Sequence, residues 1–397
     1  MLIKNLNTRI DSLDIIRGIA LFGILLVNMP LFQTPKLIAD LNFVTFPLST
    51  TDQWLRILLD VFIETKFFSI FSILFGLGFY IFMKNGEEKG KPYVRMYVRR
   101  LLFLAIIGFI HIILLWYGDI LLTYALAGFL LIIFYKQSSK ALLITWWVLT
   151  VVLISLLSLN FFASPVEVEK ELLVLQAEGT EKVERAIDYY QDSNYMEWIK
   201  YRFHHEFIPI LENLPFSILS AFYMFLVGLY IGKRNLISNF QTNKRFLKYV
   251  WWITLIISLP ISIFIVLLHL DLFNLGVLTH IYLQTMITIS GLSVSLFYLT
   301  SLLFLLQHRF WAKSLSPFKY VGRMALTNYL IQSIIGISIF VGAGLFGEIN
   351  LRIGIGLSVM IFSLQLINSY VWLKYFQYGP LEWLWRSFTY GKLQRLK

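Results

Sequence analysis

The chain has no cysteine in its 397 residues, which excludes disulfide bonds, thiolate metal sites and a cysteine nucleophile. Charged residues are also scarce: they make up 14% of the chain, whereas soluble proteins carry roughly 25%. Hydrophobic residues make up 58%, and the mean hydropathy is +0.71. Such a composition excludes an ordinary soluble globular protein and indicates a polytopic membrane protein.

Several sequence features that would point to other functions are missing. The net charge of +11 is not accompanied by a module that combines aromatic and basic residues, so we expect no nucleic-acid partner. No glycine loop for nucleotide phosphates is present, because Gly76-Leu-Gly78 lies within an apolar helix and is expected to serve close helix packing. No small-residue cleavage site follows the first apolar run, which we therefore interpret as a retained helix.

Apolar runs long enough to cross a bilayer, about 20 residues each, predict an all-α protein with ten transmembrane helices. They cover 15–34, 56–82, 101–117, 119–135, 140–162, 214–232, 249–270, 277–306, 320–345 and 351–374. The third and fourth are short, and their separation depends on a break at Tyr117-Gly118-Asp119.

The distribution of basic residues predicts the orientation of these helices. Most of the 34 Lys and Arg fall on the side of the N-terminus, so both termini are expected in the cytoplasm. We divide the chain into an N-terminal helix bundle (1–162), an external cap (163–212) and a C-terminal helix bundle (213–397). The last segment, after Pro380, is too short to cross again, and its alternating aromatic and charged residues predict an interfacial helix.

The predicted cap is the one long polar segment. Its acidic residues outnumber its basic ones, and 167–191 has helical periodicity with interleaved charges. His204-His205-Glu206 lies near its end. Adjacent histidines point apart on a helix, so this spacing favours no metal site, and we expect none.

Charged residues at the start of the first helix form the first candidate site. Asp14 and Arg17 are three residues apart and can pair on one helix face, with Arg9 one to two turns earlier. A charged pair that enters lipid is costly, so we expect it to face other helices near Arg323. The alternative is a simple positive-inside anchor.

Polar residues inside the predicted spans form the second candidate site. Asn28 follows Arg17, and His111 follows Arg100, by about 16 Å of helix rise, so both are expected at similar depth. Glu64 reaches a comparable depth from the other side, and Asp119 follows His111 at the outer turn.

A histidine and a carboxylate at one depth can act as a general base and its orienting partner. His111 with Glu64 or Asp119 is therefore the predicted catalytic group. The alternatives are a buried histidine bonded to a backbone carbonyl, and charge pairs of Glu64 with Lys66 or of Asp60 with Arg56.

Motifs along most of the chain resemble the YeiB family of bacterial membrane proteins. They are Arg9-x-x-x-Leu-Asp14-x-x-Arg17-Gly18-x-Ala20, Leu74-Phe-Gly76-Leu-Gly78, Gly108-Phe-Ile-His111, Trp116-Tyr-Gly118-Asp119, Gly322-Arg323-Met-Ala325-Leu-Thr327-Asn328-Tyr329 and Tyr378-Gly379-Pro380-Leu-Glu382. That family is similar in turn to the acyltransferase-3 and heparan-alpha-glucosaminide N-acetyltransferase families. Acyltransferase-3 proteins carry a histidine where this chain has Asn28. Chemistry at His111 is therefore inferred from the residues, and the scaffold from the resemblance.

The resemblance implies a membrane-bound acyltransferase of the bacterial plasma membrane. A cytosolic acyl-CoA would place its phosphates on basic residues, since Arg suits phosphate, and an envelope acceptor with a hydroxyl or amine would approach from outside. The predicted substrate-binding residues are Arg9, Asp14, Arg17, Asn28, Lys66, Arg99, Arg100, Arg323 and Asn328. A small-molecule transporter or exporter and a non-catalytic scaffold are the alternatives. The sequence leaves open whether two copies form a homodimer.

Overall fold

The computed structural model describes residues 6–159, 165–276 and 278–397, and within these ranges all regular secondary structure is helical. The long helices are α1 (Leu6–Gln33), α4 (Lys66–Glu88), α5 (Tyr93–Leu114), α7 (Ser139–Ser158), α8 (Pro165–Asp192), α10 (Ile208–Lys233), α11 (Phe240–His269), α12 (Leu278–Leu305) and α16 (Leu351–Tyr375). The shorter ones are α2 (Lys36–Leu41), α3 (Thr50–Phe62), α6 (Leu121–Phe134), α9 (Tyr195–Arg202), the π-helix Phe203–Phe207, α13 (Arg309–Ser314), α14 (Phe318–Arg323), α15 (Ala325–Phe340) and α17 (Pro380–Tyr390). The predicted all-α fold is confirmed.

Eight helical segments in the described residues are long and apolar enough to cross a membrane. The joined pairs α3–α4 and α9–α10 count as one segment each, and α6 and α15 are shorter apolar helices. Within the described residues, each of the ten predicted spans therefore corresponds to helix, and the protein is a polytopic helical membrane protein; residues 160–162 and 277 of the predicted spans lie outside the described residues. The break predicted at Tyr117-Gly118-Asp119 is present, because α5 ends at Leu114 and α6 begins at Leu121.

Two predicted spans are interrupted, which the sequence did not indicate. The span 56–82 divides into α3 and α4 at Thr65, whose φ of +66° lies in the left-handed region. The span 320–345 divides into α14 and α15 at Met324. Neither break contains glycine or proline, so the usual helix-breaking residues are absent from both turns.

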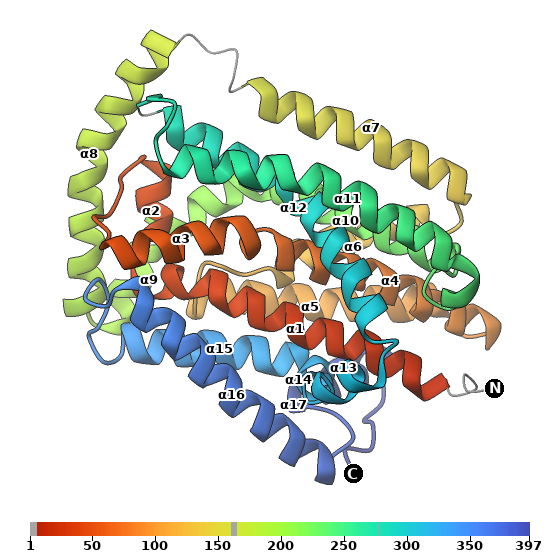
Figure 1. The fold of residues 1–397 in the computed structure, drawn as a ribbon. Helices are drawn as coiled ribbons and strands as arrows, with labels where there is room; N and C mark the ends of the chain where they lie inside the picture. Colours follow the sequence, from red (N-terminus) through yellow and green to blue (C-terminus); the bar gives the residue numbers. More distant parts are fainter. Residues whose placement is uncertain (1–5, 160–164, 277) are drawn as a thin grey trace.

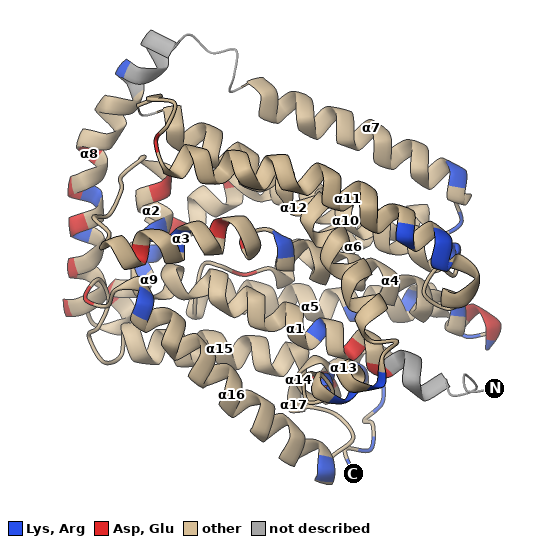
Figure 2. Ribbon diagram, in the orientation of Figure 1, with Lys and Arg blue, Asp and Glu red and all other residues tan. Residues whose placement is uncertain are grey.

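Most helices lie side by side, and α8 crosses one end of the bundle (Figure 1). The chain ends at the opposite end, where α1 also begins. Lys and Arg gather at that opposite end, whereas α8 carries many acidic residues (Figure 2). This arrangement agrees with a helical cap on one side and a basic surface on the other; which side faces the cytoplasm stays a prediction.

Glycines allow the two predicted bundles to pack directly against each other. A Cβ atom at Gly76 of α4 would lie 2.1 Å from the Phe225 carbonyl oxygen of α10, and one at Gly228 would lie 2.0 Å from the Ile73 oxygen. This confirms the packing role predicted for Gly76. The bundles at 1–162 and 213–397 thus share one interior.

The segment after Pro380 forms the predicted short helix, α17. Proline occupies its first turn, and Gly391 ends it with a φ of +65°. The helix lies against α5 and α15, with the Trp385 indole nitrogen donating to the Arg100 carbonyl oxygen at 2.8 Å. It therefore forms one wall of the basic end of the bundle.

Candidate functional site

His111 lies in the last turn of α5, beside the loop that leads into α6. It is 1% exposed, and its Nδ1 is 3.0 Å from Oδ1 of Asp119. The two atoms are within ion-pair distance but are not aligned for a hydrogen bond, and Nε2 has no partner among the described residues. Asp119 Oδ2 accepts from the Leu122 backbone N–H at 2.8 Å and so caps α6. The structure thus joins His111 to Asp119, one of its two predicted partners.

Tyr329 of α15 holds the loop between α5 and α6 in place. Its hydroxyl donates to the Gly118 carbonyl oxygen at 3.0 Å and accepts from the Ile120 N–H at 3.3 Å. Its ring centroid is 5.5 Å from that of His111. Tyr329 therefore closes the histidine off on one side, while Trp116, at 6.3 Å, covers another.

A cavity of about 510 Å³, here called the basic cavity, leads toward this loop. Its basic lining residues are Arg17, Lys89, Lys91, Arg100, Arg323 and Arg386. Apolar side chains such as Leu21, Leu74 and Phe75 line it further in. Ile120 and Tyr329, the two residues joined at the α5–α6 loop, also line it. The cavity therefore extends from the basic residues to Ile120 and Tyr329, the two residues that separate it from His111.

Contacts within the chain hold three of the basic residues around the cavity. Arg17 pairs with Asp14 at 2.6 Å, which confirms the predicted pairing and the burial of Asp14. The Arg100 guanidinium lies 3.5 Å from the ring centroid of Trp385, a cation–π contact. Arg323 donates to the Gln377 carbonyl oxygen at 3.2 Å. Because Arg100 has no ion pair among the described residues, its charge is available to an anionic ligand.

Glu382 of α17 also lines the basic cavity, and sequence reasoning missed it as a site residue. Its carboxylate accepts from the backbone N–H groups of Leu326 and Thr327 and from the Thr327 hydroxyl, at 2.7, 3.0 and 2.6 Å. It thereby caps the first turn of α15, the helix that carries Tyr329. Burial raises the pKa of Glu382, although these hydrogen bonds oppose the rise. Its place directly after Gly379-Pro380 was the available signal.

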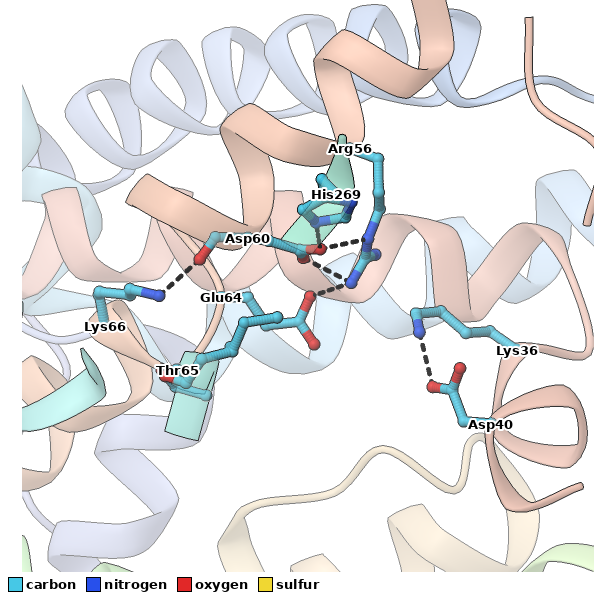
Figure 3. A network of polar contacts seen from close by, with 9 residues as sticks. Lys36, Asp40, Arg56, Asp60, Glu64, Thr65, Lys66 and His269 are labelled. Carbon is cyan, nitrogen blue, oxygen red and sulfur yellow. Dashed lines mark hydrogen bonds and ion pairs between the residues drawn. The ribbon is translucent and has the colours of Figure 1, made fainter. Parts of the chain in front are cut away.

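Glu64 and Lys66 belong to a different group of residues, here called the α3–α4 charge cluster, which also contains Arg56, Asp60 and His269 (Figure 3). Arg56 contacts Asp60 and Glu64 at 2.6 and 2.5 Å, so the alternative pairing of Asp60 with Arg56 is present. His269 Nε2 lies 2.9 Å from Asp60. The buried Lys66 amine donates to the Asp60 carbonyl oxygen at 2.6 Å. The structure therefore pairs Glu64 with Arg56 and not with His111.

Comparison with known proteins places the chain among uncharacterized bacterial proteins. "Uncharacterized protein YxaH" of Bacillus subtilis is 33% identical over 97% of this chain and 95% of that protein. A 39.9 kDa protein from the amylase 3' region of Bacillus acidopullulyticus is 32% identical over 98% and 95%, and YeiB of Escherichia coli is 29% identical over 95% of each. The chain belongs to the YeiB-like family. Residues 231–392 match the family described as "Protein of unknown function (DUF418)", and no solved structure matches.

The remaining predicted residues of this YeiB-like protein lie apart from the basic cavity. Asn328 donates to Ser369 at 2.9 Å and lines a separate cavity of about 370 Å³ between α15 and α16. Asn28 is half-buried on α1, and Arg99 is half-buried on α5; neither is among the lining residues of the basic cavity. The side chain of Arg9 lies outside the described residues.

The cap of the YeiB-like chain contacts α5 just beyond His111. The buried Arg202 donates to the carbonyl oxygens of Ile112 and Leu115, at 2.9 and 3.1 Å, and pairs with Glu206 at 2.8 Å. The last carbonyl groups of a helix lack intrahelical hydrogen-bond donors, and the Arg202 guanidinium supplies donors to two of them. His205 instead contacts the Tyr201 carbonyl oxygen. Sequence reasoning missed Arg202, because a contact between residues 90 apart leaves no local pattern.

Proposed function

We propose that this protein is a transmembrane acyltransferase of the bacterial plasma membrane. It would move an acyl group from a cytosolic acyl-CoA to a hydroxyl or amine acceptor on the other side of the α5–α6 loop. The observation that carries the proposal is the basic cavity, which is lined by six cationic residues and also by Ile120 and Tyr329, the residues in front of His111.

The lining of the basic cavity matches the chemistry of an acyl-CoA. Guanidinium groups of Arg17, Arg100 and Arg386 suit phosphate geometrically, and their end of the cavity carries most of its charge. The apolar lining further in suits the pantetheine arm and acyl chain. The thioester would then lie near Ile120 and Tyr329.

In the transfer step, His111 would take the proton of the acceptor, and Asp119 would hold the imidazole. Because the ring is buried behind Ile120 and Tyr329, transfer requires these two residues to separate. Separation would also free the Ile120 N–H, which could then donate to the developing oxyanion. Asn28, Lys66 and Asn328, predicted as substrate-binding residues, lie in other surroundings.

Transport is the second candidate, and the α3–α4 charge cluster favours it. A helix broken inside the membrane, with ionisable residues at the break, is a common arrangement at the binding sites of transporters. However, both carboxylates of the cluster are already paired within the chain, Asp60 with Arg56 and His269 and Glu64 with Arg56. Acyl transfer is supported by a cavity, so we place it first.

Incubation of purified protein in lipid nanodiscs with radiolabelled acetyl-CoA and a cell-envelope extract tests the proposal. We expect label in an envelope product and release of free CoA thiol. Arg100→Gln should weaken acetyl-CoA binding at least several-fold, whereas the matched Arg99→Gln, one residue away and outside the cavity, should not. Absence of both binding and label transfer would refute acyl transfer in favour of transport.

A further inference from the structure

A second and larger cavity, here called the lateral groove, has a volume of about 840 Å³. Helices α7, α10, α11 and α12 supply most of its wall. Helix α7 has one buried residue, Leu142, and it contacts α10 where the Thr150 hydroxyl donates to the Tyr223 hydroxyl at 3.0 Å. The residues of α7 that face the groove recur every three to four positions, as one helix face does: Leu142, Leu143, Trp146, Trp147, Thr150, Leu153, Ile154 and Leu157.

The lateral groove is lined mainly by apolar side chains, with serine and threonine hydroxyls between them. Its charged residue is Asp119, and no Lys or Arg is among its described lining residues. Most of these residues belong to helices that are long and apolar enough to cross a membrane. A hydrocarbon chain is the ligand that such a wall suits, since most of its side chains are apolar and it offers no cation to a phosphate.

Some polar side chains in the groove occur close to the candidate catalytic residues, whereas others, such as Thr150, Ser217 and Thr300, lie elsewhere along its wall. Asp119 and Thr123 come from the α5–α6 region, and Thr65 and Ser69 come from the start of α4. Ile120 lines both the lateral groove and the basic cavity. The two cavities therefore approach the α5–α6 loop from different directions, and Asp119, the partner of His111, borders the groove.

We propose that the acceptor is a neutral lipid alcohol, of the diacylglycerol type, which enters from the bilayer through the lateral groove. This inference rests on the proposed acyl transfer and specifies its acceptor. The hydrocarbon chains lie along α7 and α11, and the hydroxyl reaches the polar residues around Asp119. A phospholipid is disfavoured because its phosphate would find no cation in the groove.

The proposed reaction converts one ester-type bond into another. The lipid hydroxyl oxygen forms a bond to the acyl carbonyl carbon, and the carbon–sulfur bond of the thioester breaks. His111 takes the hydroxyl proton and passes it to the departing CoA thiolate. The products are an acylated lipid and free CoA thiol, and no oxidant or further reactant is needed.

A bulky side chain in the groove tests the proposal. Thr150 faces the groove on α7, whereas Val151 is 62% exposed and faces away from it. We expect Thr150→Trp to lower diacylglycerol binding in native mass spectrometry, and transfer of acetyl label to that lipid, at least tenfold. The matched Val151→Trp should change neither. Leu153→Trp provides a second groove variant if Thr150→Trp does not fold.

The same measurements separate the two proposals. Acetyl-CoA binding should be unchanged in Thr150→Trp, because this residue does not line the basic cavity. Label that reaches only a water-soluble acceptor, or phosphatidylglycerol bound as well as diacylglycerol, would overturn the neutral lipid acceptor and leave acyl transfer standing. Diacylglycerol binding without any labelled product would overturn acyl transfer, and with it the acceptor role.

Discussion

The substitution Asp119→Asn removes the charge beside His111 and leaves the local structure in place. Asp119 has two roles: Oδ1 lies 3.0 Å from His111, and Oδ2 caps α6 through Leu122 N–H. Asparagine is as good a helix cap as aspartate, so the free energy of unfolding should change by less than about 1 kcal/mol. If His111 is the general base, transfer should fall by roughly 10²- to 10⁴-fold.

The assay measures acetyl label transferred per folded molecule, with thermal unfolding of the same preparations in nanodiscs. Asp52→Asn is the matched control. Asp52 is also buried, accepts from Arg352 N–H at 3.0 Å and bonds Ser49, but it lies on α3. We expect this control to leave transfer per folded molecule unchanged.

His111→Gln complements that comparison. The ring is enclosed, so replacing it with alanine would leave a cavity, and large-to-small changes at buried sites cost about 2–5 kcal/mol. Glutamine fills more of the space but cannot accept the proton as imidazole does. Loss of stability with full transfer per folded molecule, in both His111→Gln and Asp119→Asn, would refute the catalytic assignment and make the pair a structural support of the loop.

Three further predictions concern packing, the cap and topology. Gly228→Ala should destabilise the protein by at least 1–3 kcal/mol, because its Cβ would lie 2.0 Å from a backbone oxygen of α4, whereas Gly78→Ala, with open space around it, should be neutral in thermal unfolding. Arg202→Met should cost about 3–5 kcal/mol by leaving Glu206 buried without its cation, and adding Glu206→Gln should recover part of that loss. Because the chain has no cysteine, Thr180→Cys should react with an impermeant label from outside intact cells; reaction only from the cytosolic side would reverse the topology.

Features that depend on neighbouring residues in the chain were predictable. The helices follow from apolar runs, the α5–α6 break from Tyr117-Gly118-Asp119, and the Asp14–Arg17 pair from a spacing of three. His111 and Asp119 also lie only eight residues apart, with the break between them. A turn at that break brings the two side chains together.

The α3–α4 break was not predictable, because contacts distant in sequence stabilise it. The Thr65 hydroxyl donates to Ile287 of α12, and Asp60 contacts His269 of α11. Depth calculated along a continuous helix placed Glu64 level with His111. It could not show that Glu64 faces Arg56 instead, since helix rise gives depth and not direction.

The residues that complete the candidate site come from the opposite half of the chain. Tyr329 and Glu382 lie more than 200 residues after His111, and their roles become visible only when α15 and α17 meet α5. The family motifs include both residues but assign neither a task. Tertiary packing therefore brings these two residues from the C-terminal part of the chain into the wall of the basic cavity.

The α5–α6 loop is held from three directions, and this has a consequence for function. Tyr329 binds Gly118 and Ile120, Asp119 caps α6, and Arg202 binds the last carbonyls of α5. The loop lies between the basic cavity and the lateral groove. Among the described residues, Ile120 lines both cavities. A thioester bound on one side would thus be kept from the other until the loop moves. Such a barrier allows transfer to an acceptor while limiting loss of the acyl group to water.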